Sequence, residues 1–318
     1  MIPINSVPSC LENYIGVKCL TTNPKSGLFI NDLPGINLRY AADIVDSDGN
    51  SGLQFLKEKI DFATLLVLQE LSGAVLPYYR LNSIMDQIKI GDFKSTFLAP
   101  SPVFRGVKIK ANKSRLLRIR VNTVKIKIQQ TGYSGNIKID NGNDFVLYPF
   151  TTDANGEAEI FPNYLSDTTD IWVLMDNTGI NVNNTETKTG CGCSSKSSHY
   201  LTGSGWNGSS LSNSTYGLQV EAVAECSFDE FGCLIISKLP FIILYRAGIE
   251  IVKEALTTDR LNSITLLDSE KGEFLLNDFT TEYNKHVKNL VDSLPELFKR
   301  MDDCCITCNR SKYTFGTP

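Results

Sequence analysis

The sequence predicts an α+β protein in which helical N- and C-terminal segments pack together around an inserted antiparallel β-sandwich or barrel. Apolar residues recur at helical spacing near both ends of the 318-residue chain, and alternation with a two-residue period fills its middle. The corresponding division is an extended N-terminal arm over 1–40, a first helical region over 41–100, a β domain over 101–234, and a second helical region with a Cys-bearing tail over 235–318.

The N-terminal region is expected to be an arm followed by helices. Short apolar pieces alternate with prolines over the first 40 residues, which is typical of an extended arm with one or two turns. Apolar residues at three- and four-residue spacing then predict an amphipathic helix over 51–72, and a second helical piece is expected over 79–88.

The middle of the chain has the pattern of short antiparallel strands. Strands are expected at 107–110, 118–121, 124–128, 136–139, 145–148, 158–161, 171–175 and 218–226. The apolar parity flips between Val121 and Val124, which predicts a bulge or turn near Asn122. Residues 176–217 are rich in Asn, Gly, Ser and Thr and are expected to be a long polar loop.

Two helices are expected after the β domain. Pro240 suits the first turn of a helix running to about residue 256. A final helix over 273–301 carries one apolar stripe, and Pro295 is expected to kink or restart it. A pentamer at 80–84 recurs at 260–264, which is a weak hint of a duplicated unit.

The charge is strongly segregated along the chain. The formal net charge is -4, yet no acidic residue lies between Asp92 and Asp140. Alternation with Ile and Val predicts one coherent basic face on the strands, which would be solvated, meet an acidic neighbouring subunit, or face DNA phosphates. The candidate residues of this interface or channel-lining face are Arg105, Lys108, Lys110, Arg115, Arg118, Arg120, Lys125 and Lys127.

Cysteine and histidine usage does not favour catalysis. There are nine Cys and only two His, and without an export signal the thiols are expected to be mostly reduced. Structural zinc or disulfides stay open as alternatives for the clustered residues Cys191, Cys193, Cys304, Cys305 and Cys308. The sequence also lacks the common nucleotide-binding, zinc-protease and serine-hydrolase motifs. We therefore expect a protein that is not an enzyme and holds no metal or cofactor.

Two further patterns are weighed and set aside. Residues 46–52 imitate the start of a calcium loop, but Ser51 stands where Gly is required and Lys57 where a bidentate Glu is required. A solvated turn and helix cap are expected there. The longest strongly apolar stretch, 233–245, is too short for a membrane span, so no span is expected.

The order of features resembles a known family. Tyr14-Ile15-Gly16-Val17, Cys19 and the stretch Ser26 to Ile36, ahead of an amphipathic helix, a middle β domain and a Cys-bearing tail, resemble the tail ring (connector) proteins of crAss-like phages of Bacteroidales. The specific portion of the resemblance covers about residues 14–71, and over the β domain only the architecture agrees.

The resemblance implies a non-enzymatic virion protein, made in the bacterial host cytoplasm. It implies a closed ring, a dodecamer, in the phage tail between the portal and the distal tail. Neighbouring tail ring, portal or distal tail proteins are the implied partners, with DNA phosphates passing through the channel as a further one. The alternative from the residues is a β-domain binding module for a host-surface glycan or protein, with Trp206 and Tyr200 as stacking residues.

Overall fold

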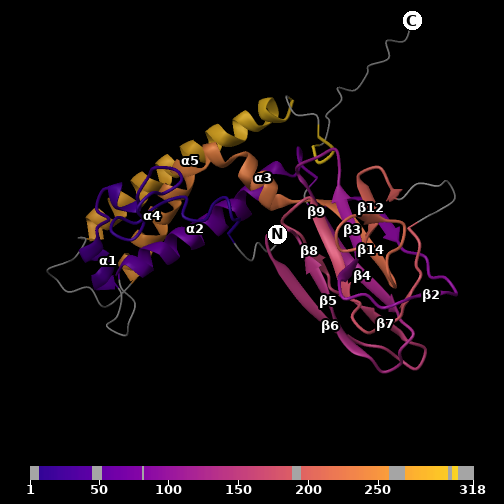
Figure 1. Cartoon of the computed structure of the whole chain (residues 1–318). Coiled ribbons are helices and arrows are strands. Elements are labelled where there is room, and N and C mark those ends of the chain that lie inside the picture. Colours follow the sequence, from indigo (N-terminus) through magenta and orange to yellow (C-terminus); the bar gives the residue numbers. More distant parts are fainter. Residues whose placement is uncertain are drawn as a thin grey trace, which may run out of the picture. The chain divides into compact units, whose positions relative to one another are not determined.

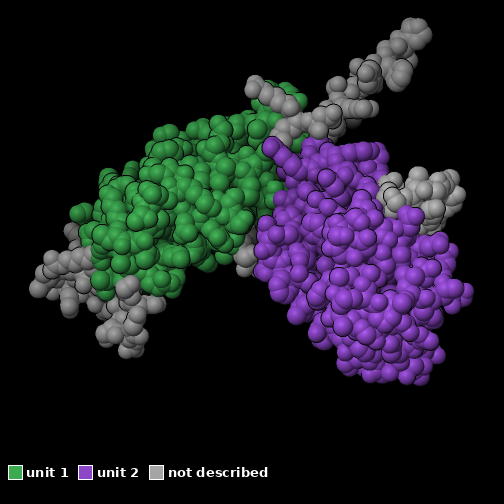
Figure 2. All heavy atoms as spheres, viewed as in Figure 1, with its two compact units in different colours: residues 1–79, 228–302, 306–318 green, residues 80–227, 303–305 purple. Residues whose placement is uncertain are grey.

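The computed structural model describes residues 7–44, 52–80, 82–187, 195–257, 269–299 and 303–306. It divides into two compact units, shown in different colours in Figure 2. The helical unit comprises residues 1–79, 228–302 and 306–318, and the β unit comprises 80–227 and 303–305. The chain is thus a mixed α+β protein with antiparallel sheets, as predicted.

Three long helices build the helical unit (Figure 1). They are α2 (Gly52–Val75), α4 (Pro240–Thr257) and α5 (Ser269–Lys299). The predictions of a helix over 51–72 and of a start at Pro240 are confirmed, because Leu56 and Leu71 lie on the buried stripe of α2 and α4 begins at its proline. Pro295 lies inside α5, which continues through it without a restart.

Shorter elements complete the helical unit. They are a 3₁₀ turn η1 (Ile30–Asp32), α1 (Leu38–Ile44), α3 (Phe228–Leu234) and a second 3₁₀ turn η2 (Ile236–Lys238). Within the described residues, no helix of the chain has the length and apolar character needed to cross a membrane.

Residues 7–37 form a packed segment where an extended arm was expected. Ile15 and Ile30 are fully or almost fully buried, and the Tyr14 hydroxyl donates to the Ile236 carbonyl at 2.5 Å. A disulfide joins Cys10 to Cys233 of α3. The prolines break regular structure here, but the apolar pieces between them are buried against the unit's own core.

The described strands of the β unit form two open antiparallel sheets and a short two-stranded ribbon (Figure 1). The five-stranded sheet has the order β1 (Ile84–Ile90), β14 (Leu218–Cys226), β4 (Leu117–Lys127), β7 (Glu157–Ile160), with β8 (Tyr164–Leu165) also paired to β4. The seven-stranded sheet has the order β11 (Ser195–Ser197), β12 (Leu201–Trp206), β3 (Phe104–Ala111), β9 (Asp170–Asp176), β5 (Ser134–Asp140), β6 (Phe145–Thr151), with β13 (Leu211–Ser212) paired to β12. The ribbon pairs β2 (Phe97–Leu98) with β10 (Val182–Asn183).

The two larger sheets approach each other where β1 meets β12. A Cβ at Gly203 of β12 would lie 1.9 Å from the Cδ1 of Ile90 of β1, so glycine allows this approach without displacing the Ile90 side chain. Ile109, Val121 and Ile139 are fully buried. Neither sheet closes on itself within the described residues, so there is no closed barrel among them.

The predicted irregularity near Asn122 is confirmed as a bulge, but the two strands expected at 118–121 and 124–128 form one strand. Residues 117–127 form the single strand β4, whose register against β14 shifts where Thr123 faces Glu221 and Val121 faces Ala222. The unpaired residue at that shift is Asn122, so the predicted bulge lies there.

Three predictions about the β region and its borders differ from the structure. Residues 84–88 of the expected helical piece over 79–88 instead belong to the strand β1, in which Ile88 and Ile90 alternate with exposed residues and pair with β14. The β unit accordingly begins at Arg80, ahead of the expected boundary at 101. The expected loop over 176–217 contains the strands β10, β11, β12 and β13, and β12 is an internal strand between β11 and β3.

Candidate functional site

The eight basic candidates do not form one continuous face. Arg105, Lys108 and Lys110 lie on β3 in the seven-stranded sheet, whereas Arg118, Arg120, Lys125 and Lys127 lie on β4 in the five-stranded sheet. Arg115 is exposed in the loop between these strands. The expectation of a coherent basic face is therefore wrong, because two successive strands with the same alternation joined different sheets.

Acidic partners within the same sheet neutralise most of the β4 cations. Arg120 makes a bidentate pair with Glu225 of β14, with nitrogen to oxygen distances of 2.9 and 2.6 Å. These hydrogen bonds raise the pKa of Arg120 above its usual value. Lys125 and Lys127 pair with Glu159 and Glu157 of β7 at 3.3 and 2.6 Å. Arg118 is 8% exposed, and its guanidinium donates to the Arg115 and Leu117 carbonyls.

The β3 cations also have local partners. Lys108 lies 3.9 Å from an Asp170 oxygen and 4.6 Å above the ring of Trp172. The guanidinium of Arg105 lies 4.9 Å from the centre of the Tyr216 ring. Lys110 is exposed. Contact of any of these cations with a neighbouring subunit or DNA stays a prediction.

The most unusual surface of the β unit is the outer face of the seven-stranded sheet. Two rows of cross-strand neighbours run across it. The first row is Leu147, Lys138, Leu174, Gly106, Trp206 and Leu211, and the second is Phe145, Asp140, Trp172, Lys108 and Ser204. Six large apolar side chains thus share these two rows with three charged ones, Lys108, Lys138 and Asp140.

We call this surface the aromatic face and define it by Phe104, Phe145, Leu147, Trp172, Trp206 and Leu211. The rings of Trp172 and Trp206 meet edge to face at 6.4 Å. Four members are strongly exposed: Phe104 at 45%, Phe145 at 52%, Leu147 at 50% and Leu211 at 56%. The outer face of an antiparallel sheet is usually polar, so an exposed apolar surface of this kind is typical of a protein contact.

The charges on the aromatic face cancel in pairs. Lys138 lies 2.6 Å from Asp140 and 4.6 Å above the ring of Phe145, and Lys108 lies near Asp170. The ion pair with Lys138 and a hydrogen bond from the Gly142 amide outweigh desolvation and lower the pKa of Asp140. The surface therefore carries little net charge, as the central region of a protein interface does.

Sequence reasoning named only Trp206 among the members of this face. Its expected partner Tyr200 lies at the other end of β12, with its ring edge-on to His199 at 4.4 Å. A signal for Trp172 was present, since alternation over 170–176 puts it opposite the buried Ile171 and Val173. The continuous apolar run from Phe145 to Tyr148 was the corresponding signal on β6.

The structure describes six of the nine cysteines, and four of these six are disulfide-bonded, which corrects the expectation of mostly reduced thiols for these four. Cys10 pairs with Cys233 and Cys226 with Cys305, with Cα atoms 5.8 and 5.5 Å apart, inside the usual range. Cys19 and Cys304 are free. The fold brought these thiols together from positions 223 and 79 residues apart.

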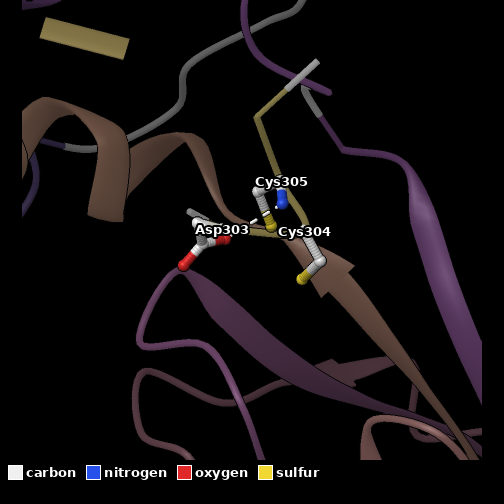
Figure 3. A group of neighbouring side chains, drawn as sticks. All are labelled: Asp303, Cys304 and Cys305. Atoms are coloured by element: carbon white, nitrogen blue, oxygen red, sulfur yellow. Dashed lines mark hydrogen bonds between the residues drawn. The ribbon is translucent and has the colours of Figure 1, made fainter. Parts of the chain in front are cut away.

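Asp303, Cys304 and Cys305 lie close together near the end of the described chain (Figure 3). Asp303 accepts hydrogen bonds from the Ser114 hydroxyl and from the Cys305 amide. Burial, and then the nearby Asp303, raises the pKa of the Cys304 thiol. Because the Cys305 sulfur is already bonded to Cys226, this group offers too few ligands for a tetrahedral zinc ion.

The remaining candidates separate into two groups. His286 stacks on Phe241 at 5.2 Å and on Tyr245 at 5.8 Å, which fits a packing role. The calcium-like loop at 46–51, Cys191, Cys193, Cys308 and the second pentamer at 260–264 lie outside the described residues.

Comparisons with known proteins add no relative. No protein-family model matches the chain, and no curated protein matches it either.

Proposed function

We propose that this chain is a non-enzymatic structural subunit of a phage tail. It assembles as a closed ring between the portal and the distal tail and bounds the channel for genome and cargo-protein ejection. The resemblance of residues 14–71 to tail ring proteins of crAss-like phages supports this function and implies a dodecamer. In this proposal the protein is made in the host cytoplasm and resides in the virion.

The aromatic face is the observation that carries the proposal. A single copy leaves Leu147, Leu211 and Phe104 about half exposed, and the neighbouring charges are already paired within the copy. Exposing such side chains to water is unfavourable by about 25 cal/mol per Å² of apolar surface. Covering them with another subunit removes that cost and supplies a driving force for assembly.

The proposal keeps the predicted arrangement of each subunit. In it, the two larger sheets form a β-sandwich that is inserted in the sequence between the N- and C-terminal helical segments. A ring requires a heterologous contact, in which two different surfaces of each copy meet. The aromatic face is one of these surfaces in the proposal.

The basic residues have a secondary role in this proposal. Since Arg120, Lys125 and Lys127 already have acidic partners, contact with a protein neighbour is favoured over contact with DNA phosphates. Lys110 and Arg115, which are exposed, are the cations best placed to meet a neighbour or the channel.

Assembly of the full chain with its neighbouring tail proteins tests the proposal, with mass measurement as the readout. We expect a closed oligomer, and we expect Leu211→Glu to prevent its formation. The matched control is Phe274→Glu, which changes an exposed phenylalanine of α5 at 68% exposure and should leave assembly intact. A wild-type chain that stays monomeric beside its neighbours would refute the ring, and equal loss with Phe274→Glu would refute the role of the aromatic face.

A second candidate function is attachment to a host-surface glycan. The two tryptophans on one exposed face favour it, because sugar rings stack on indoles. Lys108 already lies above Trp172, which leaves less of that ring open. Glycan retention by the monomer that is lost in Trp206→Ala, with no ring formed, would favour this candidate over the first.

A further inference from the structure

The strand β6 is an open edge of the seven-stranded sheet. Its only strand partner among the described residues is β5, and Figure 1 shows it at the border of the sheet. Its first three residues are all exposed, with Phe145 at 52%, Val146 at 41% and Leu147 at 50%. A long apolar edge of this kind offers a template for another strand.

The usual protections of an edge are nearly absent from β6. The strand contains no charged residue, and its seven residues pair with β5 without a register shift. Pro149 is the one exception, because proline lacks an N–H and so interrupts an added ladder. Added pairing is therefore favoured over the N-terminal half of the strand.

The hairpin fixes which backbone groups point to the open edge. The Asn141 amide donates to the Asp144 carbonyl at 3.1 Å, so these two residues form a hydrogen-bonded pair. From that pair on, non-hydrogen-bonded and hydrogen-bonded pairs alternate along β5 and β6. Val146, Tyr148 and Phe150 thus bond to β5. The backbone N–H and C=O groups of Phe145 and Leu147, and the C=O group of Pro149, point to the open edge. Because Pro149 lies at such an outward position, its missing N–H breaks no hydrogen bond within the sheet.

The Phe145 amide is already satisfied, because it donates to the Asp144 carboxylate at 2.7 Å. Between Phe145 and Pro149, Leu147 is the outward residue whose N–H and C=O are both without a hydrogen-bond partner among the residues that the structure describes. A partner strand must therefore place one of its own residues opposite Leu147, so that the two residues form a single hydrogen-bonded pair at the centre of the contact.

A second copy of β6 meets this requirement. The outward positions Phe145, Leu147 and Pro149 are symmetric about Leu147. In an antiparallel pair centred there, each Leu147 exchanges both hydrogen bonds with the other Leu147, and Phe145 of each copy lies opposite Pro149 of the other. All three side chains lie on the outer face, so the pairing also covers some of the apolar edge.

We propose that two copies of this chain pair through β6 in an antiparallel strand contact with its two-fold axis at Leu147. This contact goes beyond the proposed ring, because a two-fold contact joins copies in pairs, whereas a ring joins them head to tail.

Cysteine substitution tests the register of the contact. Opposite residues of a hydrogen-bonded pair have Cα atoms about 5.5 Å apart, within disulfide range. Leu147→Cys should therefore cross-link to itself when oxidised glutathione accepts the two electrons and two protons of the thiol pair. Peptide mapping by mass spectrometry identifies the linkage and separates it from any cross-link of the parent chain.

Phe145→Cys is the matched control. Two copies of that residue lie four positions apart along the paired strands, about 14 Å, and should not cross-link. A mixture of Phe145→Cys and Pro149→Cys chains should cross-link between the two variants. Failure of both expected linkages would overturn the proposal, as would equal self-linkage of Phe145→Cys.

Sedimentation of the reduced protein provides a second readout. Leu147→Lys should abolish the pair while circular dichroism stays unchanged, and a pair that persists would overturn the proposal. The two inferences fail separately. A ring that forms without the Leu147 linkage refutes only the two-fold contact, and a linked pair that never forms a ring refutes only the ring.

Discussion

At the scale of single residues, the carboxylate of Asp86 connects β1 to the turn before β12. One oxygen accepts the Ser198 hydroxyl at 2.6 Å and the amides of Tyr200 and Leu201 at 2.5 and 3.2 Å, and the other accepts the Gln87 amide. Desolvation raises the pKa of Asp86, but these hydrogen bonds together outweigh it and hold the pKa below its usual value. The ionised carboxylate is therefore the form that stabilises the fold.

Replacing Asp86→Asn should lower the free energy of unfolding by about 1–2 kcal/mol at pH 7, because an amide nitrogen cannot accept the bonds that the carboxylate oxygen accepts. Ser198→Ala removes one donor and should cost less. Urea denaturation of the three proteins measures both effects.

The same substitution should show a defined pH dependence. The pKa of Asp86 is lower in the folded chain than its unfolded value of about 3.9, so its contribution is complete above that value. It is lost as the pH falls through the folded pKa. The difference between wild type and Asp86→Asn should therefore shrink at acidic pH. An unchanged difference at pH 3 would contradict this role.

At the scale of elements, periodicity located several of the helices and strands but not their partners. The stripe of α2, the start of α4 and the bulge at Asn122 depend on near neighbours in sequence, and all three were predicted. The strand β12 was missed because glycine and serine have low β-propensity, and β12 is stabilised by its neighbours β3 and β11. The same periodicity, which depends only on near neighbours in sequence, predicted that the cations of β3 and β4 share one basic face, although the two strands lie in different sheets.

The two disulfides are the contacts between distant parts of the chain that can be tested most directly. Alkylation of the denatured, unreduced chain should leave Cys10, Cys226, Cys233 and Cys305 unmodified, because their sulfurs are bonded. Cys19, which is exposed and free, should react. Peptide mapping measures both results, and prior reduction is the control in which all five react. Alkylation of Cys226 or Cys233 without reductant would contradict the pairing.

At the scale of the whole molecule, the helical unit is built from two distant stretches of the chain. Its described residues come from 7–79 and from 228–299, with Ile306. Lys59 of α2 pairs with Glu254 of α4, and Tyr283 of α5 donates a hydrogen bond to Glu70 of α2. The buried stripe of α2 therefore depends on helices that lie about 200 residues later.

A chain ending at Ser227 should leave α2 without its packing partners. An isolated helix of this kind is marginal in water, so residues 52–75 should lose protection from hydrogen exchange while the central strands keep it. Hydrogen exchange with mass spectrometry on the full and the shortened chain measures this. Unchanged protection of α2 in the shortened chain would show that the helical unit does not require α4 and α5.

The sequence by itself determined the α+β class, the long helices, most of the strand positions and the segregation of charge, because these features depend on local periodicity and composition. Only the tertiary structure decided which sheet each strand joined, which cysteines met, and that Phe104, Phe145, Leu147, Trp172, Trp206 and Leu211 share one exposed surface. Those outcomes depend on pairing between residues far apart along the chain, where alternation shows that a residue faces outward but not which neighbours it has there.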